Sequence, residues 1–127
     1  MSSLVVDASA LLALLQGEAG VERWDAVIGN AVISAVNLSE VVAKLADAGM
    51  PETEIRATLE PLGLHVVDFD AAQAYQAGLL RPATKRSGLS LGDSACLALA
   101  RSRRLPVLTA DQAWKALRLG LEVRVMR

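Results

Sequence analysis

The chain has 127 residues, which is enough for one domain, and we expect residues 1–127 to form a single domain. Hydrophobic residues make up 53% of the chain and charged residues 21%, which excludes a largely disordered linker protein. The net charge is -1, and a single cysteine with a single histidine excludes both a disulfide scaffold and a zinc finger.

Strand-like and helix-like segments alternate along the chain, which is typical of a parallel sheet buried between helices. The predicted strands, in chain order, are 4–6, 31–34, 65–69, 107–109 and 122–126. The predicted helices are 9–16, 21–28, 37–48, 52–62, 71–80, 91–102 and 112–119. Glycines and prolines supply several of the expected ends, most clearly at Gly49 and Pro51. We therefore predict an α/β fold, a three-layer sandwich whose central, mostly parallel sheet is flanked by helices.

No apolar stretch approaches the roughly 20 residues that a membrane helix needs. The amino terminus also lacks the basic stretch of a signal peptide. We expect a soluble, cytoplasmic protein that has no membrane contact.

Charge is divided unevenly: residues 81–127 carry a net +7 and residues 1–80 a net -8. A basic half can meet an anionic partner such as nucleic acid. Residues 81–90 are rich in turn-forming and basic side chains, so we predict a surface loop there. Within it, Arg81, Lys85 and Arg86 are the candidates for phosphate contacts.

Four acidic residues fall near the expected carboxyl ends of strands, where open α/β sheets bind their ligands. They are Asp7 after the first strand, Glu40 early in the helix after the second, Asp93 at the start of the helix after the basic loop, and Asp111 after the fourth strand. We expect these four side chains to lie at one edge of the sheet.

Each of these acids also has a purely structural interpretation. Asn37 with Glu40, and Ser90 with Asp93, both fit a capping box at a helix start, and the other two acids fit simple N-caps. Asp93 differs in sharing a helical face with apolar residues such as Cys96, which directs its carboxylate along the core-facing stripe. Helix capping explains why these four positions are acidic or polar, but it does not explain why all four fall at the same predicted edge of the sheet.

If the four carboxylates meet, their repulsion must be relieved. Two unit charges about 4 Å apart repel by about 4 kcal/mol at an effective dielectric constant near 20. Such a cluster either takes up protons or binds a divalent cation, and oxygen-only ligands suit Mg²⁺ or Mn²⁺. A carboxylate-held Mg²⁺ suits phosphodiester hydrolysis.

Four segments occur in an order that resembles a known family. They are Val-Val-Asp-Ala-Ser-Ala-Leu at 5–11, Asn-Leu-Ser-Glu-Val at 37–41, Leu-Ser-Leu-Gly-Asp-Ser at 89–94 and Leu-Thr-Ala-Asp at 108–111. Together they resemble the PIN-domain ribonucleases and, within that family, the VapC-type toxins of bacterial toxin–antitoxin pairs. The resemblance spans almost the whole chain.

The resemblance implies an endoribonuclease that depends on Mg²⁺ or Mn²⁺ and whose catalytic residues are Asp7, Glu40, Asp93 and Asp111. It implies that Asp7 and Asp93 ligate the metal directly, and that Glu40 and Asp111 contact it directly or through water.

Further expectations come with the same resemblance. Ser9 and Thr109 match hydroxyl positions beside the site, where they would hydrogen-bond a carboxylate or a metal-bound water; alternatively, Ser9 only caps the first helix. Similar proteins dimerise and are inhibited by an antitoxin, so a homodimer and a VapB-type antitoxin are the expected partners beside RNA.

The alternative function is a Mg²⁺-binding phospho-acceptor or signalling module without nuclease activity, since such modules also carry Asp at strand ends. That class needs a lysine at a strand end. The lysines of this chain, Lys44, Lys85 and Lys115, follow none of the predicted strands, which counts against it.

Overall fold

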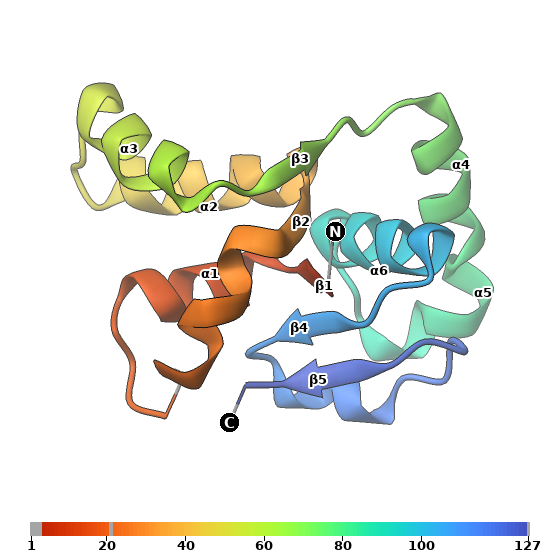
Figure 1. Ribbon diagram of the computed structural model, residues 1–127. Helices are drawn as coiled ribbons and strands as arrows, with labels where there is room; N and C mark the ends of the chain where they lie inside the picture. The colour runs from red at the N-terminus through yellow and green to blue at the C-terminus, as the bar shows by residue number, and fades with distance from the viewer. Residues whose placement is uncertain (1–3, 21, 127) are drawn as a thin grey trace.

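The computed structural model describes residues 4–20 and 22–126, which form a parallel sheet of five strands with helices on both faces (Figure 1). The strands are β1 (Leu4–Val6), β2 (Ala31–Ser34), β3 (His65–Val67), β4 (Val107–Thr109) and β5 (Val123–Val125). They lie in the order β3-β2-β1-β4-β5, and all neighbouring pairs are parallel. Their carboxyl ends therefore share one edge, and the strand order reverses between β1 and β4, where open α/β sheets leave a crevice for ligands.

Helices cover both faces of this sheet. The α-helices are α1 (Ala8–Leu15), α2 (Ala35–Asp47), α3 (Glu52–Leu59), α4 (Ala71–Leu79), α5 (Arg81–Thr84) and α6 (Leu91–Arg103). The 3₁₀ helices are η1 (Glu22–Asn30), η2 (Glu60–Leu62), η3 (Lys85–Ser87) and η4 (Gln112–Ala116). None of the described helices combines the length and apolar character that a membrane span requires.

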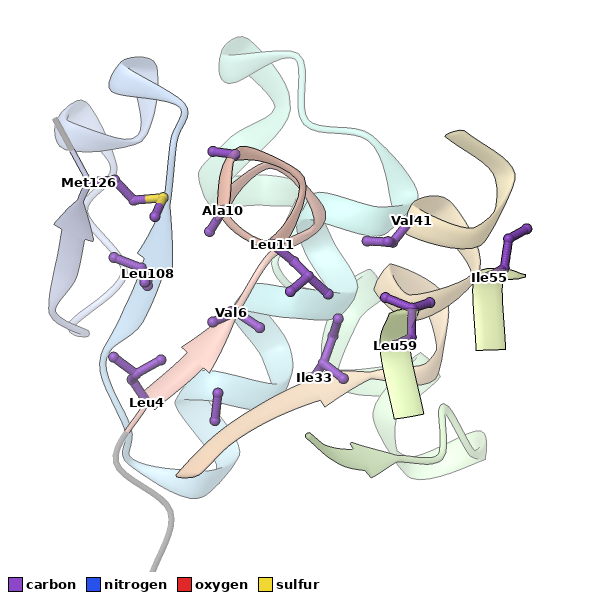
Figure 2. Packing of buried hydrophobic residues seen from close by; sticks show 12 residues of the cluster. Leu4, Val6, Ala10, Leu11, Ile33, Val41, Ile55, Leu59, Leu108 and Met126 are labelled. Atoms are coloured by element: carbon purple, nitrogen blue, oxygen red, sulfur yellow. The ribbon is translucent and has the colours of Figure 1, made fainter. Parts of the chain in front are cut away.

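Two hydrophobic layers enclose the sheet because successive strand residues point to opposite faces. Leu4 and Val6 belong to one core cluster with Leu11 of α1, the layer that α2 and α3 complete (Figure 2). Val5, between them, belongs to the opposite cluster with Leu97 of α6. All five side chains are fully buried, and burying one such side chain is worth about 1.5–3 kcal/mol. The predicted three-layer α/β sandwich is confirmed.

The predicted loop over 81–90 is wrong for its first part, which folds as α5 and η3. Pro82 lies in the first turn of α5, where its fixed φ angle suits a helix and its missing N–H is not needed. The buried Thr84 hydroxyl donates to the Leu80 carbonyl at 2.9 Å, which ties this turn to the end of α4. The turn ends at Gly88, whose φ of 65° favours glycine.

Smaller differences concern helix type and element ends. The segments predicted as helices over 21–28 and 112–119 are the 3₁₀ helices η1 and η4, and Val21 lies outside the described residues. The third strand ends at Val67 instead of residue 69. Helix α4 begins as predicted after Asp70, whose carboxylate accepts from the Gln73 amide at 2.9 Å.

Candidate active site

One cavity of about 230 Å³ lies at the carboxyl edge of the sheet. Its wall is formed by Asp7, Ala8, Ser9, Leu12, Asn37, Glu40, Lys44, Asp93 and Asp111. The four acidic candidates thus come from four separate segments: the end of β1, α2, the first turn of α6, and the residues after β4. The structure brings all four to the same cavity.

Asp7 is the buried member of this set, with 4% of its surface exposed. It is the N-cap of α1, and its Oδ1 accepts from the Ala10 amide at 2.8 Å. The Ser9 hydroxyl donates toward both carboxylate oxygens at 2.8 and 2.9 Å, and the Thr109 hydroxyl donates to Oδ2 at 2.5 Å. Ser9 and Thr109 therefore contact the carboxylate, and Asp7 rather than Ser9 caps the helix.

Burial raises the pKa of Asp7 above its ordinary value, and this is the largest effect on it. Hydrogen bonds from Thr109, Ala10 and Ser9 lower the pKa, and the negative charge of Asp93 raises it further. The ionised carboxylate is therefore disfavoured in the protein alone. A cation in the cavity would stabilise the ionised form.

The same two hydroxyls connect β1 to the segment after β4. Ser9 Oγ accepts from the Ala110 amide at 3.0 Å, and Thr109 Oγ1 accepts from the Asp111 amide at 3.0 Å. The exposed Asp111 caps η4 by accepting from the Ala113 amide at 2.9 Å. Its structural interpretation as an N-cap is correct, and the capping side chain also lines the cavity.

Asp93 likewise combines capping with a place in the cavity wall. The Ser90 hydroxyl accepts from the Asp93 amide at 3.2 Å, and Asp93 Oδ2 accepts from the Ser90 amide at 3.0 Å, which completes a capping box. The capping box uses Oδ2 and leaves Oδ1 for another ligand.

The corresponding prediction for α2 is wrong: Ser34, not Asn37, is the N-cap, and its hydroxyl accepts from the Val36 amide at 3.2 Å. Asn37 lies inside the helix and is buried. Its Nδ2 donates to Glu40 Oε1 at 2.9 Å and to the Gly92 carbonyl of α6 at 3.0 Å. Asn37 is thus a site residue that sequence reasoning assigned only to capping.

Lys44 is the second residue of the cavity that sequence reasoning missed as a site candidate. It lies four residues after Glu40 and seven after Asn37, so all three occupy one face of α2, and this helical spacing is the signal that was available. Arg81, Lys85 and Arg86 lie in α5 and η3, outside the described wall of this cavity.

The carboxylates of the cavity also affect the buried thiol of Cys96. Burial raises the pKa of its thiol well above the ordinary value, and the negative charges of Asp7, Asp93 and Glu40 add to the effect. Three carboxylates from three segments therefore act on one thiol of α6. The thiol stays protonated and packs as a small core residue.

The donor chemistry of the cavity fits a hard divalent cation. Its potential ligands are carboxylates, which Mg²⁺ and Mn²⁺ prefer, and Asn37 Oδ1 is a buried acceptor without a hydrogen-bond partner in the described part of the chain. As these side chains stand, no three His, Cys, Asp or Glu residues among those described are placed to hold one ion together. Two carboxylates can still hold such an ion, because Mg²⁺ keeps several of its waters when it binds to a protein.

Comparison with known proteins gives a family match and structural neighbours. The model of the PIN domain family matches residues 4–119. The DNA-bound VapBC structure from Salmonella typhimurium is similar with a TM-score of 0.79 at 20% identity, covering 100% of both chains. No curated protein sequence matches the chain.

Two further solved structures share the fold at similar identity. A toxin–antitoxin complex from Klebsiella pneumoniae gives a TM-score of 0.77 at 20% identity, covering 98% of each chain. VapC20 of Mycobacterium tuberculosis, described as a sarcin-ricin loop cleaving toxin, gives 0.73 at 20% identity, covering 90% of this chain and 94% of that one. Because the family model spans nearly the whole described sequence, the chain belongs to the PIN domain family.

Proposed function

We propose that this protein is a metal-dependent endoribonuclease that hydrolyses RNA phosphodiester bonds, and that it is the toxin of a VapBC-type toxin–antitoxin pair. The observation that carries the proposal is the cavity at the carboxyl edge of the sheet, whose wall holds carboxylates from four separate segments. Membership of the PIN domain family supports it, as do the names of the similar structures, which include toxin–antitoxin complexes and a sarcin-ricin loop cleaving toxin.

Mg²⁺ or Mn²⁺ is the proposed cofactor, held directly by Asp7 and Asp93, with Glu40 and Asp111 in contact directly or through water. When bound, such an ion supplies Lewis-acid assistance to the attack of water on a phosphodiester. The pKa of Asp7 is raised chiefly by burial and further by the negative charge of Asp93, which supports this assignment because a bound cation would stabilise the ionised carboxylate.

The hydroxyls of Ser9 and Thr109 have a positioning role in this proposal. Both donate to the Asp7 carboxylate, so they fix its orientation and favour its ionised form. They also accept from the amides of Ala110 and Asp111, so one network holds the ends of β1 and β4 together. A shift of either strand end would therefore move the Asp7 carboxylate.

RNA binding needs positive charge around this acidic cavity. Lys44 is the cation in the described cavity wall, and we propose that it contacts a phosphate next to the scissile one. Arg81, Lys85 and Arg86 are proposed to contact the strand further away, where they contribute affinity that weakens as salt is added.

The proposed protein partners are a VapB-type antitoxin and a second copy of this chain in a homodimer. Tyr75 and Leu79 of α4 are 74% and 70% exposed and line one apolar hollow, a surface that suits burial against another protein. We propose that this face of α4 forms the homodimer interface. We also propose that the protein is located in the cytoplasm. Leu79→Glu should shift the protein from dimer to monomer in sedimentation analysis, and an unchanged dimer would place the interface elsewhere.

The test of the nuclease proposal is RNA cleavage by the purified protein with Mn²⁺ or Mg²⁺, then with EDTA. We expect cleavage that EDTA abolishes and that Asp7→Asn and Asp93→Asn lose without loss of folding. Equal cleavage by wild type and variants would identify a contaminating nuclease and end the proposal. An inactive protein that instead takes up phosphate from a small phospho-donor would favour the alternative of a phospho-acceptor module.

A further inference from the structure

Glu40 lines two hollows of the surface. One is the acidic cavity of about 230 Å³, and the other is a hollow of about 630 Å³ whose lining includes Phe69, Leu91 and Gly92. A glutamate side chain has three rotatable bonds, and either hollow offers space for its end. Something must therefore hold the carboxylate in place if it is to serve the acidic cavity.

Two contacts restrain this carboxylate, one within α2 and one from α6. Asn37 is 1% exposed, and its Nδ2 donates both to Glu40 Oε1 and to the Gly92 carbonyl. Gly92 is buried in the first turn of α6, and a Cβ at this position would overlap both carboxylate oxygens of Glu40. The carboxylate thus occupies the space that the missing side chain of Gly92 leaves free.

We infer that Asn37 and Gly92 are positioning residues that form a seat for the Glu40 carboxylate and thereby hold it in the cavity for a divalent cation. This inference rests on the proposed function, since it assigns the seat to that same site. Asn37 contributes the donor, and Gly92 contributes the space and a carbonyl that fixes the orientation of the Asn37 amide.

The free oxygen of Asn37 points to the same assignment. With Nδ2 facing two acceptors, the amide orientation is determined, and Oδ1 is left buried without a partner in the described structure. A buried acceptor without a partner is costly, so such an atom is normally satisfied by water or a ligand. Asn37 is a residue of the cavity wall, so a water or ligand that enters with the cation would satisfy this atom.

Gly92→Ala tests the seat with little risk to folding. The three heavy atoms nearest to the added methyl all belong to the end of the flexible Glu40 side chain, and alanine is the better helix former, so we expect an unchanged or higher melting temperature. Displacement of Glu40 should weaken Mn²⁺ binding about 10- to 100-fold in calorimetry without RNA, the range for residues that support a metal ligand. Gly29→Ala is the control, because a Cβ there meets nothing within 4 Å.

A double-mutant cycle separates positioning from general damage. In a Glu40→Ala background, Gly92→Ala should not weaken Mn²⁺ binding further, because the group that Gly92 positions is absent. Additive losses of Mn²⁺ affinity in the double variant would overturn the inference. A Gly92→Ala protein that binds Mn²⁺ like wild type, or a wild-type protein that binds no Mn²⁺, would overturn it as well. A wild type that binds Mn²⁺ but leaves RNA intact would instead end the nuclease proposal and leave the seat supported.

Discussion

The starts of α2 and α6 carry the same sequence pattern and use it differently. Asn37 precedes Glu40 by three residues, just as Ser90 precedes Asp93. In α6 the pair forms a capping box within its own first turn. In α2 the N-cap is Ser34, one turn earlier, so Asn37 and Glu40 lie inside the helix. There the Asn37 amide donates to the Glu40 carboxylate and to a backbone carbonyl of α6.

This difference decides what holds each carboxylate in the cavity. Asp93 is held by its own helix start, a local arrangement that forms whenever α6 forms. Glu40 is held through Asn37 and Gly92, so its position depends on how α2 packs against α6. The α6 acid should therefore tolerate changes in packing, and the α2 acid should not.

The largest expected effects on RNA cleavage come from substitutions that remove the negative charge of a site carboxylate and keep its hydrogen bonds. Asp93→Asn retains an oxygen for the Ser90 amide and Glu40→Gln retains one for Asn37, so both should fold. Because Asp93 is a proposed direct ligand, its variant should lose more than about 100-fold in single-turnover RNA cleavage, beyond the roughly 10- to 100-fold loss expected of supporting residues. Urea unfolding checks stability, and near wild-type cleavage by Asp93→Asn would contradict its role.

The next effect is a pH dependence centred on Asp7. Its folded-state pKa is raised, so the protein without metal loses stability as pH rises above the ordinary carboxyl range and the buried group ionises. Asp7→Asn does not titrate there. The melting temperature of Asp7→Asn minus that of wild type, both in EDTA, should therefore increase from pH 4 to pH 7.

Added Mn²⁺ provides the control for this pH effect. It should raise the melting temperature of wild type at pH 7 by binding the folded state, and it should raise that of Asp7→Asn much less. If the difference in melting temperature between the two proteins in EDTA stayed constant with pH, burial would not be what sets the pKa of Asp7.

The smallest expected effect concerns the capping box. Ser90→Ala should destabilise the protein by about 1 kcal/mol, the usual cost of losing an N-cap, and should weaken Mn²⁺ binding less than Gly92→Ala does. Ser39→Ala, at an exposed position of α2, should change stability by no more than about 0.5 kcal/mol. If Ser90→Ala weakened Mn²⁺ binding more than Gly92→Ala, the contrast between the two helix starts would be refuted.

The sheet and the shared edge of the four acids could be predicted because strand periodicity and strand ends are local signals. Val5 and Val6 followed by Asp7, for example, indicate a buried strand and its end without reference to the rest of the chain. Joint placement of the acids then followed from the rule that parallel strands share one carboxyl edge. The PIN-like fold itself also rested on the resemblance of the four segments.

The role of Asn37 could not be predicted because two polar residues one turn apart, Ser34 and Asn37, both qualify as N-caps. Only the packing of α2 against α6 shows that Asn37 faces the Gly92 carbonyl. The turn after α4 was missed for a related reason: Pro82 signals a loop and a helix start equally well, and the bond from Thr84 to the preceding helix decides between them.

The most direct test of the central claim is a crystal structure of the full chain grown with Mn²⁺, with anomalous scattering used to locate the ion. The account predicts an anomalous peak inside the cavity, with carboxylate oxygens of Asp7 and Asp93 as its protein ligands and Glu40 still seated against Gly92. Saturating Mn²⁺ with no peak in that cavity, or a peak held only by surface residues elsewhere, would contradict it.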